Sequence, residues 1–470
     1  MLGSYIFQAS FFHKITSLKN MENRRQFLKK MAVGVIALNS APSSLLSATG
    51  SKLAMNMKKS VSPNSYINIA LIGKGGMGTS DTQTALSVDG VKLLAVCDLY
   101  DKRLDDAKRQ WGNDLFITKD YKEVLALRDV DAVIIATPDH WHQTIAIEAM
   151  KEGKHIYCEK PVIHQINEAK ALIEAQEKNR VFFQIGSQGM ASVGNQIAKL
   201  LIQNKVIGKV NFIDGQFTSA PGILKAFNAP KDASEKTIWW ERFLGNAPKR
   251  PFDAQRFFAW RNWKDYGTTI AGDLFVHVIS SVHYIMDTNG PNKIYTTGGI
   301  HHYTNGSRDT PDVMLGLFDY PEKNNLGAFT LSLGANYVDG ISKKWGSTDF
   351  KIIGSKGSID VKWNEVKLKT THDLNEKDFE VLNEISDKIN KPQIITSKEY
   401  NITVLEGDRG AHFHHFSNFF DAIRNNKPLE ANVHFGVRSS ATALLSYESY
   451  KQNQAIYWNP ESLKVRNKPF

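Results

Sequence analysis

The sequence predicts an α/β protein in which a doubly wound parallel sheet is followed by an α+β domain with an open, mainly antiparallel sheet. Three observations support this fold class. A glycine-rich loop joins an apolar strand to a helix near residue 73. Strands and helices then alternate with short loops as far as about residue 187, and long strand-like stretches with few helical patterns follow. We therefore expect a first domain at residues 66–187 and a second at residues 188–470.

The first 65 residues are expected to lie outside both domains. Residues 1–60 hold nine Lys and Arg against one acid, so they supply eight of the ten net positive charges. The stretch NRRQFLKKMAVGVIALNSAPSSLLSA has a twin arginine, a moderately apolar run and a small-residue end at Ala48, which is the layout of a twin-arginine export signal. We expect an N-terminal extension and signal at 1–48, with Met21 as the true start, and a polar linker at 49–65.

A basic amphipathic helix is the alternative reading of this leader, but several features favour export. The apolar run is too short and too rich in Gly, Ala and Ser for a comfortable membrane span, and no cysteine follows it for a lipid anchor. The remaining 410 residues are nearly neutral, so a nucleic-acid partner is not expected. Cys97 and Cys158 each end an apolar run and are expected to be buried and unpaired.

The first domain opens with an apolar strand over residues 67–72 and a loop of the pattern G-x-G-x-x-G. Such a pattern alone is weak evidence, but here it follows a strand and precedes a helix. The glycines allow a tight turn, a close approach of the backbone to a pyrophosphate, and close packing of helix on strand. The helix N-terminus offers free N–H groups to the phosphates. We expect a Rossmann domain whose dinucleotide is bound by Gly73, Gly75, Gly76, Met77 and Gly78.

The second strand, over residues 91–98, ends at Asp98. A carboxylate at this position can accept hydrogen bonds from the adenosine ribose hydroxyls, which favours NAD. Arg103 lies in the following helix and can instead accommodate a 2′-phosphate, so the sequence leaves NADP open. Asp98 can also cap that helix, over residues 101–111, and the two roles are compatible.

Two further strands are expected over residues 131–136 and 154–158, with a helix over about 142–152 between them. The carboxyl ends of parallel strands meet at one edge of a sheet, where ligands bind. We expect the loop after the first of these strands to place the nicotinamide. The cofactor-binding residues expected in this loop are Thr137, Pro138, His140 and His142.

The second of these strands ends abruptly at Glu159, Lys160 and Pro161. Proline has no N–H and a fixed φ, so it stops the strand at that point. Glu159 and Lys160 are therefore expected at the ligand-binding edge, where Glu159 positions Lys160 or the nicotinamide ribose. The sequence leaves open whether Lys160 is catalytic or only a charge at a strand end.

Beyond residue 190 the stretches around 208–219, 293–304, 312–320, 326–337 and 347–363 read as strands of an antiparallel sheet with one exposed or substrate-facing side. A helix is expected over the stretch HFHHFSNFFDAIRNNKP. The aromatic-rich stretch IWWERFLGNAPKRPFDAQRFFAWRNWKDYG suits the C–H faces of a sugar, although such rings also fill cores. Five histidines, which show no metal-site spacing and are expected to be structural or substrate-facing, are His301, His302, His412, His414 and His415.

Asp273 and His277 are four residues apart, which puts both on one face of a helix. A carboxylate beside an imidazole fixes its tautomer and makes it a better base. His277 is thus a candidate general base, and Asp273 a candidate for the group that orients it.

The glycine loop, IATPDHWH and EAMKEGKHIYCEKP together resemble the Gfo/Idh/MocA oxidoreductases, named for glucose–fructose oxidoreductase and inositol dehydrogenase. The resemblance covers about residues 66–460. It implies that Lys160 is catalytic through contact with the reacting hydroxyl or carbonyl, and that Asp273 and His277 complete the site. The expected reaction is then the oxidation of a secondary alcohol. His277, oriented by Asp273, takes the proton, Lys160 stabilises the charge that develops on the oxygen, and the nicotinamide accepts hydride. Many relatives carry a glycine two residues after the aspartate, where this chain has Phe275. That departure concerns the local backbone and the pocket volume.

Export determines how the protein could obtain its cofactor, because the periplasm has no substantial pool of NAD. Twin-arginine export carries folded proteins, so NAD could be loaded in the cytoplasm, bound tightly and recycled in the site. Three functions are then open: a sugar oxidoreductase, an NAD-dependent glycosidase with redox-neutral turnover, or a non-catalytic sugar-binding relative.

The first of these functions is favoured. In the exported N-acetylgalactosaminidases that resemble this family the lysine of E-K-P is often replaced, whereas Lys160 is intact here. A binding relative would not need Lys160, Asp273 and His277 together. We expect a periplasmic oxidoreductase without a metal, whose partners are a sugar or sugar derivative and, during export, the twin-arginine translocase. It is expected to form a homodimer or homotetramer, as the exposed sheet face suggests.

Overall fold

The computed structural model describes residues 66–218, 227–338, 348–466 and 468. The export signal and the linker expected at 1–65 lie outside the described residues. Within the described part of the chain no helix is both long enough and apolar enough to cross a membrane.

Six parallel strands form the first sheet, in the spatial order β3–β2–β1–β4–β5–β6. β1, β4 and β6 are almost wholly buried, as expected for strands with helices on both faces. The order is that of a doubly wound dinucleotide-binding sheet, which confirms the predicted fold class. The strands are β1 (Ile67–Ile72), β2 (Val91–Cys97), β3 (Phe116–Thr118), β4 (Ala132–Ile135), β5 (His155–Glu159) and β6 (Phe183–Gly186).

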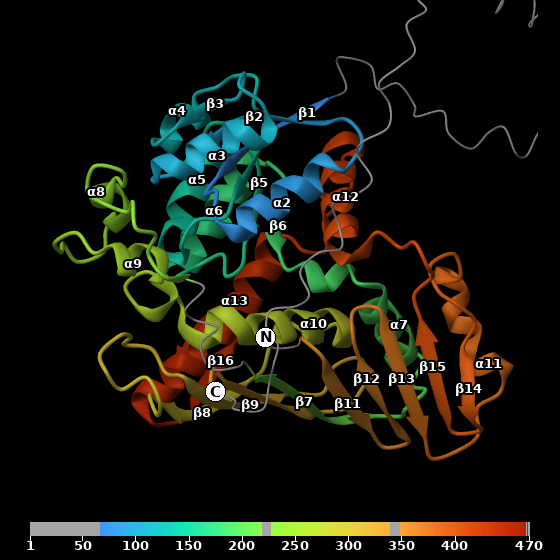
Figure 1. Cartoon of the computed structure of the whole chain (residues 1–470). Coiled ribbons are helices and arrows are strands. Elements are labelled where there is room, and N and C mark those ends of the chain that lie inside the picture. The colour runs from blue at the N-terminus through green and yellow to red at the C-terminus, as the bar shows by residue number, and fades with distance from the viewer. Residues whose placement is uncertain (1–65, 219–226, 339–347, 467, 469–470) are drawn as a thin grey trace, which may run out of the picture. The chain divides into compact units, whose positions relative to one another are not determined.

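Five helices connect these strands and cover the sheet (Figure 1). They are α2 (Gly76–Leu86), α3 (Asp101–Trp111), α4 (Tyr121–Leu125), α5 (His142–Lys151) and α6 (Glu168–Asn179). The expected elements agree with these bounds to within about two residues. The sequence did not predict β3 and α4, which are too short to show a hydrophobic period. Cys97 and Cys158 are buried and free, as predicted.

The second sheet has eleven strands in the order β14–β15–β13–β12–β11–β7–β10–β9–β8–β16–β17. Its pairs are antiparallel except β7 with β10, so the sheet is mixed but mainly antiparallel, as predicted. Its strands are β7 (Val210–Thr218), β8 (Lys293–Gly299), β9 (Val313–Tyr320), β10 (Phe329–Asn336), β11 (Phe350–Gly354), β12 (Gly357–Val361), β13 (Glu365–Thr370), β14 (Gln393–Thr396), β15 (Glu399–Thr403), β16 (Ile456–Asn459) and β17 (Lys464–Arg466).

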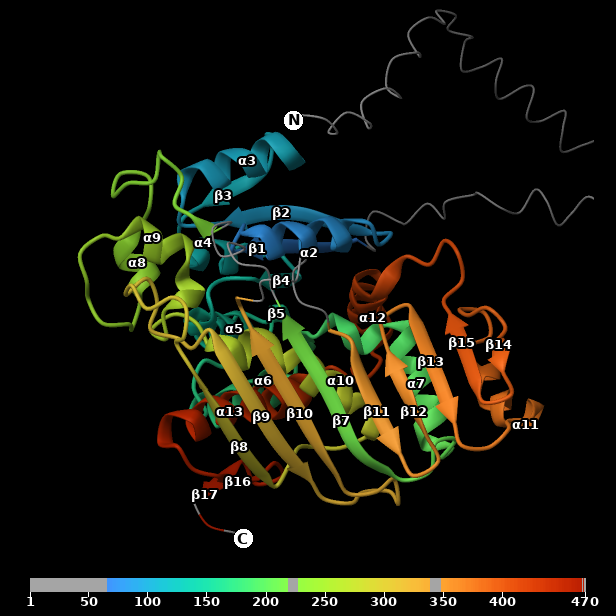
Figure 2. The ribbon, with the colours of Figure 1, turned by 60° about the horizontal axis from the view of Figure 1, so that its bottom comes forward.

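In Figure 2 the strands of this sheet lie side by side across the view, and helices lie behind one face of the sheet. The larger helices of this half are α7 (Val193–Gln203), α10 (Val276–Met286), α12 (Gly410–Asn425) and α13 (Val433–Gln452). The shorter ones are α8 (Trp240–Leu244), α9 (Ala254–Phe258) and α11 (Glu376–Phe379). On the opposite face β8 and β9 expose Tyr295, Leu315 and Leu317.

Helix α12 returns from the second half of the chain to pack against α2 of the first (Figure 1). The Phe416 ring stacks on Tyr157 of β5 with ring centroids 4.2 Å apart. Phe416, Phe419 and Phe420 share one buried cluster with Ile69 and Leu71 of β1. The core beneath the first sheet is therefore completed by residues from both halves of the chain.

His283 of α10 makes the stability of this fold depend on pH. Burial lowers the pKa of His283 to about 3, and the nearby charges of Arg438 and Lys323 lower it further; its Nε2 lies 3.0 Å from the Tyr320 hydroxyl. An unfolded histidine binds its proton near pH 6.5. Between these values the unfolded state binds more protons, so acidification destabilises the fold.

We expect His283 to account for about 2 kcal/mol of lost unfolding free energy at about pH 5 relative to neutral pH. Urea unfolding of the wild type and of His283→Gln at both pH values checks this. The variant should lose less free energy on acidification than the wild type, and an equal loss would contradict the assignment.

Candidate active site

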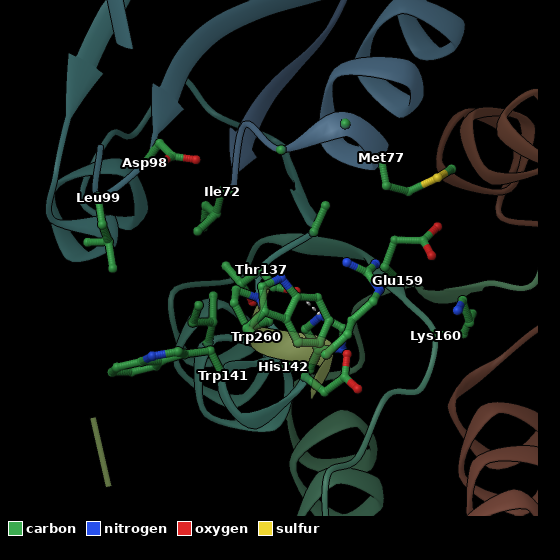
Figure 3. Close-up of a pocket in the computed structure, with 18 of the residues that line it drawn as sticks. Ile72, Met77, Asp98, Leu99, Thr137, Trp141, His142, Glu159, Lys160 and Trp260 are labelled. Atoms are coloured by element: carbon green, nitrogen blue, oxygen red, sulfur yellow. Dashed lines mark hydrogen bonds between the residues drawn. The ribbon is translucent and has the colours of Figure 1, made fainter. Parts of the chain in front are cut away.

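A pocket of about 510 Å³ opens at the carboxyl ends of the strands of the first sheet. Figure 3 shows Asp98 and Leu99 at one end of it, Glu159 and Lys160 at the other, and Thr137, His142 and Trp260 between them. Its elongated lining joins the glycine loop to residues of the second half of the chain. The position is where a doubly wound sheet binds its ligand.

The glycine loop leaves room for a dinucleotide. Gly75 is the N-cap of α2 and provides no side-chain cap, so the first N–H groups of the helix remain available. A Cβ added at Gly75 or Gly76 would meet no atom within 4 Å, whereas one at Gly78 would lie 2.0 Å from the Gly73 carbonyl oxygen. The loop is thus tightly packed at its base and open toward the pocket, which fits a bound diphosphate.

This contrast predicts two different effects of alanine. Gly75→Ala should leave the unfolding midpoint almost unchanged but weaken NAD binding by at least about tenfold, because the added methyl group occupies the space of the diphosphate. Gly78→Ala should destabilise the fold by about 3 kcal/mol, because the methyl group overlaps backbone. Thermal unfolding and NAD titration of both variants check this. Unchanged NAD affinity in Gly75→Ala would show that the diphosphate does not lie there.

Asp98 sits just beyond β2 and is 5% exposed. Its carboxylate accepts the backbone N–H of Lys74 at 2.8 Å and of Tyr100 at 3.0 Å, and it lies 3.4 Å from the Arg103 guanidinium. The N-cap of α3 is Tyr100, so Asp98 is not the cap that its position allowed. Instead it ties the glycine loop to the end of β2 at one end of the pocket.

Lys160 and Asp273 meet at the other end of the pocket. The Lys160 Nζ donates to the Asp273 backbone oxygen at 2.7 Å and lies 3.3 Å from its carboxylate. The Arg261 Nε donates to the same carboxylate oxygen at 3.2 Å. Burial alone would raise the pKa of Asp273, but the charges of Arg261 and Lys160 outweigh it and hold the pKa well below its usual range. Asp273 is therefore an anion fixed between two cations.

His277 lies in the same lining, near Lys160. Its pKa is lowered to about 3, chiefly by burial and then by the Lys160 charge, while the Asp273 charge acts in the opposite direction. The net effect differs from the sequence-based expectation that Asp273 would make His277 a better base. Among the described residues, the groups that hydrogen-bond the Asp273 side chain are Lys160, Arg261 and the Tyr337 hydroxyl. His277 is thus a neutral imidazole at pH 7, with a lone pair available for a proton.

The backbone that carries Asp273 and His277 is not a regular turn of α-helix. Asp273 lies in η6 (Ala271–Phe275), a π-helical turn that runs into α10, where His277 is the second residue. Such turns often occur at functional sites. Phe275, which stands where many relatives have glycine, is fully buried and packs near Phe217 and Phe318. It fills the core beneath the site and does not line the pocket.

The structure places most of the residues predicted for the site around one pocket. Those that line the pocket are Gly73, Gly75, Gly76, Met77, Asp98, Arg103, Thr137, Pro138, His142, Glu159, Lys160, Asp273 and His277. Gly78 is at the base of the loop instead. His140 is also outside the lining: it is packed against the second half of the chain, with its Nε2 2.8 Å from the Phe243 carbonyl oxygen.

The lining residues that were not predicted from the sequence include Trp141, Gln188 and Trp363. The aromatic-rich stretch, which was expected to suit a sugar or to fill a core, contributes Arg242, Phe243, Phe257, Phe258, Trp260 and Arg261. His412, which was expected to be structural or substrate-facing, lines the pocket as well. Among the described residues no group of three or more His, Cys, Asp or Glu is placed to hold a metal ion.

Residues 237–261, which we call the clasp, reach across to the first sheet and contain α8 and α9 (Figures 1 and 2). The Trp239 N–H donates to the Leu99 oxygen and the Asp101 N–H to the Thr237 oxygen, each at 3.0 Å. Most of the clasp's large rings pack into a small core that includes Tyr100 of the first half. The aromatic-rich stretch is thus mainly structural, and only part of it lines the pocket.

Two sequence models of one family match this chain. One, an oxidoreductase family NAD-binding Rossmann fold, matches residues 67–187, and the other, the C-terminal alpha/beta domain of the same family, matches residues 246–457. The chain belongs to the Gfo/Idh/MocA oxidoreductase family. Residues 67–187 of this family member are therefore an NAD-binding Rossmann domain, and the glycine loop and Asp98 lie within it.

Solved structures share the fold of this Gfo/Idh/MocA protein. A levoglucosan dehydrogenase in complex with NADH and levoglucosan has a TM-score of 0.62 at 17% identity and covers 83% of this chain and 99% of its own. A dehydrogenase from Bordetella pertussis in complex with NADH and UDP-GlcNAcA has a TM-score of 0.62 at 16% identity, over 84% and 99% of the two chains.

Curated relatives match over a shorter length. A glycosyl hydrolase family 109 protein of Shewanella baltica is 30% identical over 176 residues, and an alpha-N-acetylgalactosaminidase of Shewanella oneidensis is 32% identical over 180 residues. Each match spans 34% of this chain and 38% of the relative.

Proposed function

We propose that this protein is an exported, NAD-dependent oxidoreductase that oxidises a secondary alcohol of a sugar or sugar derivative. The observation that carries the proposal is the meeting of Lys160, Asp273 and His277 at the end of the NAD pocket remote from Asp98. Trp260 and Trp363 line the same pocket and offer flat apolar faces to a sugar ring. Bound NAD would supply the hydride acceptor.

The protein's own residues would handle the alcohol oxygen. Lys160 has three N–H donors, of which the Asp273 backbone oxygen and carboxylate take two, so one remains for the substrate oxygen. Its positive charge stabilises the negative charge that develops there. The neutral His277 accepts the proton as general base. The Asp273 carboxylate, held by Arg261, keeps the Lys160 ammonium in place.

We also propose that NAD is preferred to NADP and is retained tightly. Arg103 is already paired with Asp98, so a 2′-phosphate would have to displace that carboxylate. The clasp lines the pocket with Arg242, Phe243, Phe257 and Phe258 and is anchored to the first half by hydrogen bonds and a shared core. Release of NAD would require this core to open.

Arg242 tests the retention of NAD. It pairs with Asp120, and its guanidinium lies 4.8 Å from the ring centroid of Tyr121 and 5.7 Å from that of Trp141. We expect Arg242→Ala to raise the rate of NAD dissociation at least about tenfold, in line with about 1.4 kcal/mol or more of lost anchoring. Nucleotide content after repeated desalting measures this.

The matched control is Arg250→Ala. Arg250 lies in the same clasp and donates to Asp265 at 2.8 Å, but it does not line the pocket. It should leave NAD content unchanged. Equal loss of NAD from both variants would show that general loosening of the clasp, and not the Arg242 anchor, releases the nucleotide.

A second candidate function is a redox-neutral, NAD-dependent glycosidase, which the names of the curated relatives favour. Those relatives are matched over little more than a third of their length, and the intact Lys160 supports the oxidoreductase. One experiment separates the two. Purified protein without added cofactor is mixed with a panel of free sugars and aryl glycosides while the reduced-nicotinamide absorbance band is recorded.

A lasting rise of the band with a free sugar supports an oxidoreductase that awaits a second substrate. Release of the aryl group without a lasting rise supports the glycosidase. Neither signal, in protein shown to contain NAD, contradicts both. Periplasmic localisation, for which the twin-arginine leader is the support, is tested by fractionation of cells that express the protein with and without Arg24-Arg25.

The proposal includes a homodimer or homotetramer. Its support is the outward face of β8 and β9, where Tyr295, Leu315 and Leu317 are each more than 40% exposed. Light scattering of the wild type and of a variant with Leu315→Lys and Leu317→Lys tests it. A monomeric wild type would contradict it.

A further inference from the structure

Asp81 is a buried acid in α2 whose surroundings are unusual. It is 0% exposed, and neither of its carboxylate oxygens has a hydrogen-bond donor among the described residues. A buried carboxylate without a donor or a cation costs several kcal/mol. Asp81 follows Met77 of the glycine loop by four residues, so it lies one helical turn further from the pocket.

The group beside Asp81 is a second carboxyl, that of Glu159. Glu159 is 5% exposed and lines the pocket, where Figure 3 shows it near Met77 and Lys160. Its Oε1 accepts the Gln188 amide at 2.6 Å, and the same amide donates to the Tyr157 hydroxyl at 2.9 Å. Glu159 therefore joins the pocket to the buried Asp81.

Two carboxylates in contact repel each other, and a proton between them removes the repulsion and supplies the missing donor. Burial, and then the charge and hydrogen bond of Glu159, raise the pKa of Asp81 well above its usual range. Asp81 is therefore the group that keeps a proton and donates it. Burial raises the pKa of Glu159 to about 7, although the Lys160 charge and the Gln188 hydrogen bond lower it.

Other titratable groups near the pair do not replace this proton. Lys160 and Arg261, the cations that act on Glu159, are both bonded to Asp273. The groups on neighbouring elements are Tyr157 and Cys158 of β5, and His412 and His415 of α12. Burial raises the pKa of the first two and lowers that of the two histidines, so all four are neutral at pH 7.

We propose that Asp81 and Glu159 form a proton store for the redox cycle. Asp81 keeps one proton and donates it in a hydrogen bond to Glu159, and Glu159 takes up a second proton when bound NAD is reduced. The inference rests on the proposed oxidoreductase function. Oxidation of the alcohol would break its C–H bond, with the hydride accepted by bound NAD, and its O–H bond, with the proton going to His277 and, within the pocket that both side chains line, to the Glu159 carboxylate. The reverse transfers occur when a second substrate is reduced.

The physical cause of the uptake is the charge of the nicotinamide. The oxidised ring is cationic and the reduced ring is neutral, so reduction removes a positive charge from the pocket that Glu159 lines. Protonation of Glu159 then becomes more favourable. A protein that retains its cofactor could keep the proton of one half-reaction for the next. Asp81 is a positioning residue here, because it acts through Glu159.

The test is an infrared pH titration of the holoenzyme, loaded with NAD⁺ or NADH by long incubation with an excess of either. We expect a protonated-carboxyl band that titrates near neutral pH in the NAD⁺ form and at a higher pH in the NADH form. Glu159→Gln should lose this band. Asp81→Asn should keep it, because an amide can also donate to Glu159, whereas Asp81→Ala should move its midpoint upward.

The matched control is Glu168→Gln, another largely buried glutamate, which accepts the His164 N–H at 2.7 Å and does not line the pocket. It should leave the cofactor-dependent band in place. Equal midpoints in the NAD⁺ and NADH forms, or a band that survives in Glu159→Gln, would overturn the proposal. If the two forms differ but no sugar of the panel reduces the cofactor, the proton store stands and the proposed function fails.

Discussion

Lys160→Met is expected to lower the rate of sugar-dependent NAD reduction by about 10³-fold, while NAD remains bound. The reason is that Lys160 supplies both the hydrogen bond and the positive charge at the oxygen where negative charge develops, and methionine supplies neither. Methionine has nearly the same length, so the packing of the pocket should be preserved. Single-turnover absorbance measurements give the rate, and nucleotide content gives the occupancy.

The control for this variant is Lys170→Met, which changes an exposed lysine of α6 that pairs with Glu174. It should turn over like the wild type. If Lys160→Met retained more than about a tenth of the wild-type rate, the group that stabilises the oxygen would have to be another residue, and the proposed mechanism would be wrong.

Asp273→Asn is expected to cost about 3 kcal/mol of unfolding free energy, because it leaves Lys160 and Arg261 close together without their shared carboxylate. The rate should also fall by about 10²-fold, since the Lys160 ammonium loses the group that holds it. Urea unfolding and single-turnover rates measure the two effects separately.

A double-mutant cycle with Arg261→Met sharpens this prediction. Removing one of the two cations should recover part of the stability lost in Asp273→Asn, with a coupling energy of at least about 1 kcal/mol. Additive losses would show that Arg261 and Asp273 act independently. The activity should not recover, because Lys160 still lacks its carboxylate.

The features that the sequence predicted well depend on residues that are close together in the chain. The glycine loop, the strand that ends at Lys160, and Asp98 each depend on a strand and the few residues after it. Their places follow from the topology of a doubly wound sheet. For the same reason the bounds of β1 and β5 were close to the structure.

The features that the sequence did not reveal depend on contacts between distant segments. Nothing local marks Arg261, one arginine in an aromatic-rich stretch, as the partner of Asp273. The rings around it read equally well as a sugar platform or as a core, and most proved to be core. Asp81 was not among the residues predicted for the site. Only the packing of α2 on the first sheet places its carboxyl beside Glu159.

The return of α12 to the first half of the chain has a consequence for biosynthesis. Phe416, Phe419 and Phe420 complete the cluster that contains Ile69 and Leu71, yet they are made some 350 residues later. A ribosome-bound chain would therefore carry an unfinished core beneath the first sheet until synthesis is nearly complete. A fragment that stops near residue 187 would expose Tyr157 and its apolar neighbours to water, which makes that boundary a poor place to divide the protein.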